Sequence, residues 1–302
     1  MTSIPTIGFV GVGNMGWPMA ACLVKAGFAV QVADARRVQA ENFAQQIGGS
    51  APDTLAQLAA GCDVVITMLP TSANVADALA DGADTLLAGL RPGSVVIDMT
   101  SGQPAATQAL ALRVAEAGSV MIDAPVSGGV VRARTGQLAI MVGGDAATIA
   151  RVRPVLDAIG TSVLPCGAVG AGQAMKALNN LVSGGGFLIA IEALLIGQKF
   201  GLDAGLMTDV LNVSTGMNNS TQKKLRQFVL SRGFDSGFSL DLMVKDLSIA
   251  TAMGNDSGVP APFAALCREM WAAAAAMLGP GQDHTAIARF SERLAGTTLT
   301  EG

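Results

Sequence analysis

The sequence predicts an α/β domain with a mostly parallel sheet, followed by an all-α domain. In the first half, short apolar runs alternate with helix-compatible segments, which is the pattern of βαβ units. A glycine-rich turn, Gly11–Gly16, directly follows the first of these runs. After about residue 172 the strand signals fade and long helical patterns take over. We therefore expect one domain at residues 1–165 and a second at residues 166–302, with the boundary near Pro165–Gly172.

The composition of the chain excludes several classes of protein. The 302 residues are 50% hydrophobic and 14% charged, which excludes intrinsic disorder and indicates a large buried core. The net charge is 19 − 23 = −4 and there is no basic tract, so nucleic acid is not the expected partner. The four cysteines lie far apart and there is one histidine, so we expect no disulfide framework and no metal site. Tyrosine is absent, which excludes a tyrosine acid.

The chain shows no predicted targeting or membrane segment. Residues 1–6 lack the basic and apolar regions of a signal peptide. The longest apolar stretch, Leu181–Gly197, contains three consecutive glycines and Glu192. Since a membrane span needs about 18–20 clean apolar residues, this stretch is interpreted as a buried helix. We expect a cytoplasmic protein with no membrane partner.

The individual elements follow from apolar patterning and end signals. Strands are expected at Thr6–Val10, Ala29–Ala33, Val64–Leu69, Ser94–Met99, Val120–Ala124 and Leu138–Val142. A helix at Met15–Ala26 should stop at Gly27. Later helices are expected at Ala174–Phe200, Ala204–Asn212, Gln222–Leu230, Leu242–Met253 and Pro262–Met277. Gly184–Gly186 would cost about 1 kcal/mol each relative to alanine, so a helix break or very close packing is expected there.

The glycine turn carries the first functional prediction. Gly11, Gly13 and Gly16 form GxGxxG between a strand and a helix, the context that identifies a Rossmann-type dinucleotide-binding domain. The first glycine permits the tight turn, the second lets the backbone approach a pyrophosphate, and the third lets helix and strand pack closely. The free N–H groups of the following helix point at the phosphates. An NAD or NADP cofactor is therefore expected.

Asp34 bears on the choice between the two cofactors. It ends the second strand, 34 − 16 = 18 residues after the last glycine, close to the roughly 20 expected for an acid that binds the adenosine ribose. A carboxylate at that position repels a 2′-phosphate, which favours NAD. Arg36 and Arg37 could accommodate that phosphate, so NADP remains possible.

Four motifs extend this interpretation over nearly the whole chain. They are GFVGVGNMGWPM at Gly8–Met19, DAPVSGG at Asp123–Gly129, GAGQAMKALNN at Gly170–Asn180, and KDL at Lys245–Leu247. In order and spacing they resemble the β-hydroxyacid dehydrogenase family. One departure is TSGQP at Thr100–Pro104, where many members have a serine-rich SSxxP-type segment.

The resemblance implies an enzyme that transfers a hydride between NAD(P) and a small β-hydroxyacid or its semialdehyde. It implies 3-hydroxyisobutyrate as the first substrate to consider. Tartronate semialdehyde (2-hydroxy-3-oxopropionate) is the alternative, because Asp283-His284 is similar to the C-terminal part of the reductase branch. In the family a long helix joins the domains and contributes to subunit contacts, which implies a homodimer or homotetramer.

Site residues carry over by position within the matched motifs. The resemblance and the glycine fingerprint together place the cofactor at Gly11, Gly13, Asn14, Met15, Gly16, Asp34, Leu69, Pro70, Val75, Thr100 and Lys245. Ser127, Gly128 and Gly129 are expected to bind the substrate carboxylate through the Ser127 hydroxyl and backbone N–H groups. Asn180 is expected to orient the substrate, with a helix–helix hydrogen bond as the structural alternative. Arg132 and Arg134 are expected to face solvent.

Hydride transfer leaves one proton to be handled by a titratable side chain. Lys176 is the preferred general acid/base, because it lies in an otherwise apolar helical stretch where a charge is costly unless it is functional or reaches solvent. Its spacing of four residues from Asn180 predicts one helix face. To accept a proton, Lys176 needs a lowered pKa, which desolvation or a nearby cation such as Lys245 would cause. The carboxylate of a bound substrate would shift the pKa of Lys176 in the opposite direction. His284, expected at the surface or rim, is the weaker candidate.

Another class of function stays open at this point. A noncatalytic dinucleotide-binding or scaffold protein would share the glycine turn, but there the lysine position should be dispensable. Imine reductases share the fold, and the retained Lys176 disfavours them.

Overall fold

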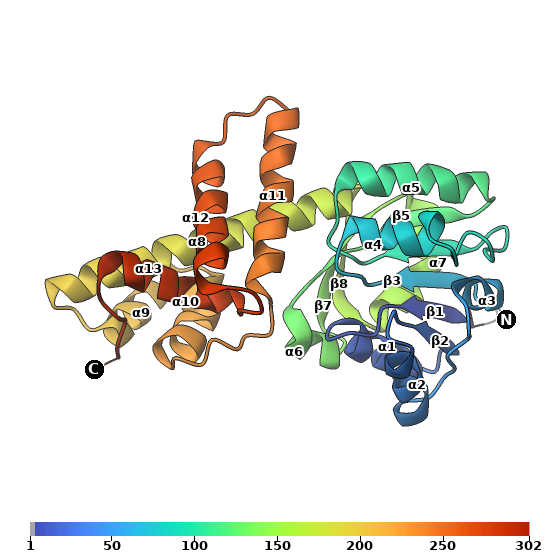
Figure 1. Ribbon diagram of the computed structural model, residues 1–302, viewed down its shortest axis with the longest axis horizontal. Coiled ribbons are helices and arrows are strands. Elements are labelled where there is room, and N and C mark those ends of the chain that lie inside the picture. The colour runs from blue at the N-terminus through green and yellow to red at the C-terminus, as the bar shows by residue number, and fades with distance from the viewer. Residues whose placement is uncertain (1–3, 302) are drawn as a thin grey trace. The chain divides into compact units, whose positions relative to one another are not determined.

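The computed structural model describes residues 4–301 and divides into two compact units, Met1–Lys176 and Ala177–Gly302 (Figure 1). Residues 1–3, which belong to the segment considered for a signal peptide, lie outside the described residues. The first unit is α/β with a mostly parallel sheet and the second is helical, which confirms the predicted fold class. The domain boundary expected between residues 165 and 166 stays a prediction.

Within the described residues, the first unit is built on an eight-stranded sheet. The strands are β1 (Ile7–Val10), β2 (Val30–Ala33), β3 (Val64–Thr67), β4 (Val95–Asp98), β5 (Val120–Asp123), β6 (Val126–Ser127), β7 (Leu138–Gly143) and β8 (Gly160–Gly167). Their order is β2-β1-β3-β4-β5-β7-β6, and β8 pairs with β7. The pairs from β2 to β5 are parallel, and β7 is antiparallel to β5 and β6. All six predicted strands are present, whereas β6 and β8 were missed.

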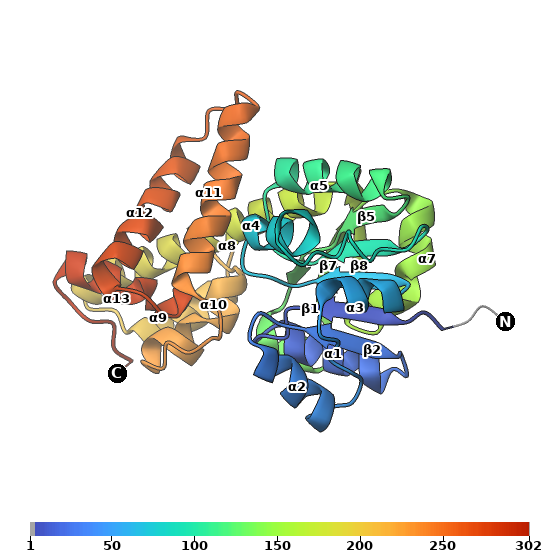
Figure 2. The same ribbon diagram turned by 45° about the vertical axis from the view of Figure 1, so that its right-hand side comes forward.

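Helices cover both faces of this sheet (Figure 2). One face packs against α1 (Gly16–Lys25), α2 (Arg37–Gln46), α6 (Gly129–Arg134) and α7 (Ala146–Asp157). The other packs against α3 (Leu55–Gly61), α4 (Ser72–Ala76), α5 (Pro104–Glu116) and a π-helical turn at Asp77–Asp81. Successive strand residues alternate between the two layers: Val64 and Ile66 join the first core and Val65 joins the second. Burial on both faces explains why these strands are continuous apolar runs.

The second unit packs its helices around a large apolar core, with a small additional cluster at Ala177, Ile249 and Ala250. Its elements are α8 (Ala171–Phe200, which begins in the first unit), α9 (Ala204–Asn212), α10 (Asn219–Lys223), a π-helical segment (Leu225–Leu230), α11 (Leu240–Asp256), α12 (Pro262–Leu278), a 3₁₀ turn (His284–Ala286) and α13 (Ile287–Ala295). The expected single helix Gln222–Leu230 is wrong. Lys224 departs from helical geometry there, and the chain continues as the π-helical segment. Asp203 caps α9, since its side chain accepts a hydrogen bond from the Leu206 N–H at 2.7 Å.

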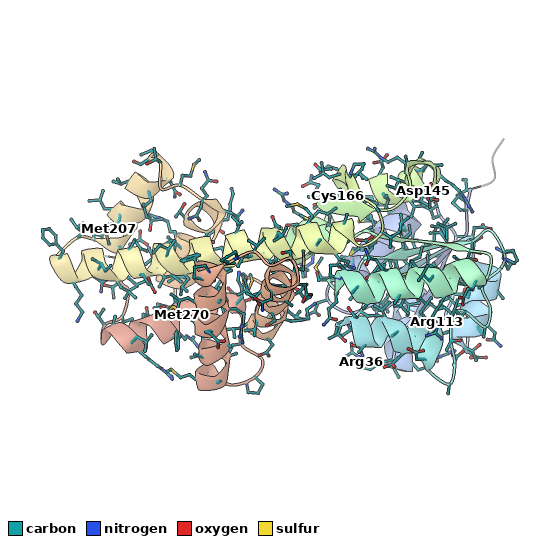
Figure 3. All side chains as sticks on the ribbon, turned by 90° about the horizontal axis from the view of Figure 1, so that it is seen from above. Arg36, Arg113, Asp145, Cys166, Met207 and Met270 are labelled. Carbon is teal, nitrogen blue, oxygen red and sulfur yellow. The ribbon has the colours of Figure 1, made fainter. Side chains whose placement is uncertain are left out.

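Helix α8 runs without a break through its three consecutive glycines (Figure 3). A Cβ atom added to Gly185 would lie 3.1 Å from the Phe263 ring, and one added to Gly184 would lie 3.4 Å from Leu247. Close helix packing therefore accounts for Gly185, whereas an added Cβ at Gly184 would make an ordinary van der Waals contact. The helix continues through all three glycines, so the alternative of a helix break is wrong. By length and composition alone α8 is apolar enough to cross a membrane, but 56% of its most apolar window is buried within the fold.

Candidate active site

The glycine turn follows β1, which lies between β2 and β3 and is the point where the strand order reverses. Ligands of open α/β sheets bind at this position, outside the carboxyl ends of the strands. Gly11 has φ +98°, and a Cβ atom there would lie 2.3 Å from the Met68 carbonyl oxygen. A Cβ atom on Gly16 would lie 1.8 Å from the Gly11 carbonyl oxygen. Gly13 differs, because apart from Gly13 and its two chain neighbours no described atom lies within 4 Å of its added Cβ. Gly11 and Gly16 are thus required by the protein's own packing, whereas Gly13 faces open space that suits a cofactor.

The Asp34 carboxylate fixes the conformation of the glycine turn. Asp34 Oδ2 accepts a hydrogen bond from the Val12 N–H at 3.0 Å, and Oδ1 accepts one from the Arg36 N–H at 3.0 Å. A carboxylate has about four acceptor positions, so these two bonds leave capacity for ribose hydroxyls. The Arg37 guanidinium is committed to its own loop, where it binds Glu41, Asp53 and the carbonyls of Ala51 and Pro52. Of the two arginines weighed for a 2′-phosphate, the largely exposed Arg36 is the better placed.

A row of polar side chains ends the central strands. Thr67, Asp98 and Asp123 are the last residues of β3, β4 and β5 and stand in register across the sheet. Thr67 Oγ1 donates to Asp98 Oδ1 at 2.9 Å, and the Thr100 N–H donates to the same oxygen at 3.1 Å. Burial raises the pKa of Asp98 to about 6, against the lowering effect of these hydrogen bonds, and burial also raises the pKa of Asp123. Buried carboxyl groups at strand ends mark a polar edge next to the glycine turn.

Four of the residues expected at the cofactor follow β3 and β4: Leu69, Pro70 and Thr100 lie on loops, and Val75 lies on α4. The Leu69 N–H donates to Thr100 Oγ1 at 2.9 Å, which joins the two loops. Val75 is fully buried on α4, and Pro70 is exposed. In the divergent TSGQP segment, a Cβ atom on Gly102 would lie 2.6 Å from Ser72 Oγ, which also accepts a hydrogen bond from the Gln103 N–H. Local packing thus accounts for glycine at this position.

The DAPVSGG segment forms β6 and the start of α6. Ser127 is partly exposed at the end of β6. Gly128 and Gly129 have φ values of +131° and +66°, in the region that favours glycine. A Cβ atom on Gly128 would lie 2.6 Å from Arg132 Cδ. Arg132 and Arg134 are exposed, as predicted.

Lys176 and Asn180 both lie on α8, four residues apart and therefore on one helix face. Both side chains are buried, with 8% and 6% of their surface exposed. Asn180 Nδ2 donates to Asp246 Oδ2 at 2.5 Å, and Lys245 Nζ lies 3.2 Å from Asp246 Oδ1. The helix–helix hydrogen bond considered as the alternative for Asn180 is thus present, and it fixes the direction in which the amide points.

His284 does not lie at the surface or rim, so that expectation is wrong. It is 4% exposed and packs among the rings of Phe187, Phe238 and Trp271 in the second unit. Burial lowers the pKa of His284, which favours the neutral ring at pH 7. Asp283 accepts hydrogen bonds from the Gly237 and Phe238 N–H groups and from Thr285. The polar Asp283-His284 pair is therefore part of the packed structure of this unit.

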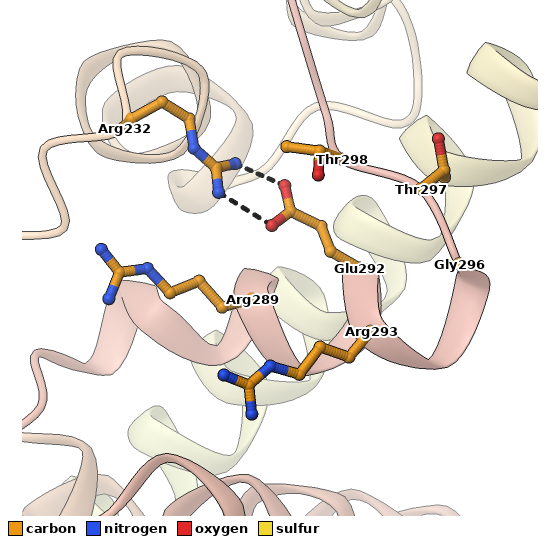
Figure 4. A pocket seen from close by; sticks show the side chains of 7 residues that line it. All are labelled: Arg232, Arg289, Glu292, Arg293, Gly296, Thr297 and Thr298. Carbon is orange, nitrogen blue, oxygen red and sulfur yellow. Dashed lines mark hydrogen bonds and ion pairs between the residues drawn. The ribbon is translucent and has the colours of Figure 1, made fainter.

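A cavity of about 460 Å³ lies elsewhere in the second unit (Figure 4). It is lined by Arg232, Arg289, Glu292, Arg293, Gly296, Thr297 and Thr298. The Glu292 carboxylate accepts two hydrogen bonds from the Arg232 guanidinium, one of them at 2.9 Å. The lining residues and the predicted site residues are different sets, so the cavity is separate from the proposed chemistry.

Comparison with known proteins extends these observations. The family described as the NAD binding domain of 6-phosphogluconate dehydrogenase matches residues 6–168. The family described as NAD-binding of NADP-dependent 3-hydroxyisobutyrate dehydrogenase matches residues 170–291. NAD or NADP is therefore the cofactor of this chain.

Individual relatives match over most of their lengths. The chain is 34% identical over 296 residues to 2-(hydroxymethyl)glutarate dehydrogenase of Eubacterium barkeri, covering 98% of both chains. It is 38% identical over 271 residues to 3-hydroxyisobutyrate dehydrogenase of Pseudomonas aeruginosa, covering 88% of this chain and 90% of the relative. The solved structure of Mycobacterium tuberculosis 3-hydroxyisobutyrate dehydrogenase with L-serine has a TM-score of 0.87 and 35% identity, covering 95% of this chain and 99% of that one.

Proposed function

Because this chain belongs to the β-hydroxyacid dehydrogenase family and is an NAD(P)-dependent enzyme acting on a CH–OH group, we propose that Lys176 is its general acid/base. The observation that carries the proposal is the burial of this lysine near the start of α8, in the same compact unit as the glycine turn. A lysine amine held away from bulk water is a titratable group of the kind that a proton transfer needs. His284, the other candidate that the sequence offered, is enclosed among aromatic rings in the second unit, which disfavours it as the proton handler.

The proposed roles follow from the chemistry of the residues. NAD(P), when bound, supplies the acceptor or donor of the hydride. In oxidation, Lys176 Nζ takes the proton of the substrate hydroxyl while a carbonyl forms at that carbon, and in reduction it returns a proton to the carbonyl oxygen. The Ser127 hydroxyl and the backbone at Gly128 and Gly129 bind the substrate carboxylate, and Asn180 orients the substrate through its amide. Gly13, which has space beside it, lets the backbone approach the pyrophosphate.

The substrate is proposed to be a small β-hydroxyacid, with 3-hydroxyisobutyrate first and NAD as the preferred cofactor. Two of the relatives described above carry the name of that activity, and Asp34 supports NAD. Tartronate semialdehyde is the alternative, although packing alone now accounts for Asp283 and His284. 2-(Hydroxymethyl)glutarate joins the test because its dehydrogenase matches this chain from end to end.

A panel of initial rates tests these assignments. Small hydroxyacids and semialdehydes, 2-(hydroxymethyl)glutarate included, are assayed with NAD and NADP in turn. We expect the highest kcat/KM with 3-hydroxyisobutyrate and a lower KM for NAD than for NADP, because the Asp34 carboxylate repels a 2′-phosphate. A clear NADP preference would contradict the role given to Asp34. Tight cofactor binding without turnover of any substrate would favour the noncatalytic alternative.

We place this enzyme in the cytoplasm. Its four cysteines, all within the described part of the chain, are free thiols, as is usual in a reducing compartment. The most apolar helix, α8, is mainly buried in the fold.

A homodimer or homotetramer is proposed from an apolar stripe along α8. Val182, Ile189 and Ile196 are seven residues apart and expose 76%, 53% and 72% of their surfaces. A seven-residue repeat keeps side chains on one helix face, which is the pattern that helices use to pack against each other. Soluble monomers rarely leave extended apolar patches uncovered. We infer that this stripe contacts a second copy of the chain.

Light scattering tests the oligomer directly. Replacing Val182 and Ile196 together by glutamate should convert the protein to monomers, because charges would be buried in the interface. Leu112→Glu is the matched control, since Leu112 is 69% exposed on α5 of the first unit, and it should leave the oligomer intact. A compact wild-type monomer at assay concentration would contradict the proposal.

A further inference from the structure

Gln173 ties the start of α8 to the carboxyl end of the central sheet. It lies three residues before Lys176 and is 1% exposed. Its backbone N–H donates to Asp123 Oδ2 at 2.8 Å, and the Gly170 N–H donates to Asp123 Oδ1 at 2.6 Å. The carboxylate at the end of β5 therefore holds the first turn of the helix that carries the lysine.

The side-chain amide of Gln173 binds the loop that follows β4. Oε1 accepts a hydrogen bond from the Gly102 N–H at 2.8 Å, while Nε2 donates to the Thr100 carbonyl oxygen at 2.7 Å and to Asp98 Oδ2 at 3.3 Å. A side-chain amide has two N–H donors and one acceptor oxygen. Both donors and the oxygen of Gln173 are therefore used, and only the second lone pair of the oxygen is left. The partners also determine the orientation of the amide, because Oε1 faces a donor and Nε2 faces two acceptors.

These bonds connect the proposed acid/base to the proposed cofactor loops within a single compact unit. The Thr100 carbonyl oxygen accepts a hydrogen bond from the Gln173 amide, and the Thr100 hydroxyl accepts one from the Leu69 N–H. Thr100 and Leu69 are both proposed to line the cofactor cleft. Gln173 and Lys176 are three residues apart on one helix, so they project from neighbouring positions of the same side. A shift of the loop relative to α8 would have to break the bonds of Gln173.

We propose that Gln173 is a positioning residue that keeps the loop at Thr100–Gly102 at a constant distance from Lys176. This inference rests on the proposed function, because it assigns Gln173 an effect that passes through Lys176. Its loss should impair the chemical step more than cofactor binding, since a displacement of about 1 Å between reacting groups can cost about 100-fold in rate. Gln173 itself exchanges no proton with the substrate.

The test compares Gln173→Met, which keeps the length of the side chain but makes no amide hydrogen bonds, with the same change at Gln108. Gln108 Nε2 donates to the Val169 carbonyl oxygen at 3.1 Å, close to the same helix start, but is exposed. We expect Gln173→Met to lower kcat by about 10- to 100-fold while the KM for the cofactor changes by less than about 3-fold. Gln108→Met should retain wild-type kinetics. Gln173→Glu, which replaces the donating nitrogen by an oxygen facing Thr100 and Asp98, should lose at least as much kcat.

A double variant separates positioning from a merely structural role. In a Lys176→Ala background, Gln173→Met should lower the residual rate by less than about 3-fold, because residues that act as a unit are not additive. The same fall in both backgrounds, or a raised cofactor KM with unchanged kcat, would overturn the proposal. Failure of both Gln173 variants to fold would also overturn the proposal, because the hydrogen bonds of Gln173 would then be required mainly for folding. If Lys176→Ala alone retains full turnover, the proposed function fails, and this outcome is distinguishable from the others.

Discussion

Lys176→Ala should lower turnover by about 10²- to 10⁴-fold, the usual contribution of general acid–base catalysis, and leave cofactor binding largely intact. The Lys176 amine is proposed to carry the one proton that hydride transfer leaves behind, and the methyl side chain of alanine cannot bind or release a proton. The proposed cofactor contacts of the glycine turn and of Asp34 do not involve this side chain. Steady-state kinetics and a fluorescence titration with the reduced cofactor measure the two effects separately.

Two further lysine variants make the test specific. Lys176→Arg keeps the positive charge but cannot release a proton near neutral pH, so turnover should stay low. Lys199→Ala removes an exposed lysine from the other end of the same helix and should be neutral. Full turnover in Lys176→Ala, or its recovery in Lys176→Arg, would reject Lys176 as the proton handler.

Gly16→Ala and Gly13→Ala should have opposite consequences although they lie three residues apart in one motif. An added Cβ on Gly16 would lie 1.8 Å from the Gly11 carbonyl oxygen, so the turn has to move. Overpacking of this kind usually lowers the free energy of unfolding by about 1–3 kcal/mol. We expect Gly16→Ala to cost at least the upper value, because the contacted atom belongs to the backbone and cannot move aside easily. The added methyl group of Gly13→Ala meets no described atom within 4 Å beyond its own residue and its two chain neighbours, so the free energy of unfolding should stay nearly unchanged.

The effect of Gly13→Ala should appear in cofactor binding instead. Its methyl group would enter the space where the backbone is proposed to approach the pyrophosphate, so the KM for the cofactor should rise at least tenfold, equivalent to about 1.4 kcal/mol. Chemical denaturation and initial rates measured on both variants give the comparison. A Gly13→Ala variant with wild-type KM would contradict the location of the cofactor, and a stable Gly16→Ala variant would contradict the packing role of the third glycine.

The sheet and the long helices could be predicted because their signals are local. The strands β1, β3 and β4 are buried on both faces and appear in the sequence as apolar runs. β8 was missed because only Gly160 and Val163 of its residues are buried, so it has no such run. The nine-residue α13 was also missed, because the segment after Gly279–Gly281 was interpreted from its polar residues as a surface stretch.

Contacts between distant residues are the part of the site that sequence patterns do not contain. Gln173 binds Asp98 across 75 residues, and nothing in the GAGQAMK motif distinguishes its amide from a surface glutamine. A usable signal was the recurrence of Asp or Thr at the ends of buried strands, as at Thr67, Asp98 and Asp123. His284 was misplaced because its polar neighbours suggested solvent, whereas hydrogen bonds to Asp283 allow the segment to be buried.

The most direct test of the central claim is a crystal structure of the enzyme with oxidised cofactor and a β-hydroxyacid substrate or inert analogue. The account predicts Lys176 Nζ within about 2.6–3.2 Å of the ligand hydroxyl, on the carbon that faces the nicotinamide. A nitrogen directed into bulk water, with another side chain on that hydroxyl, would contradict it.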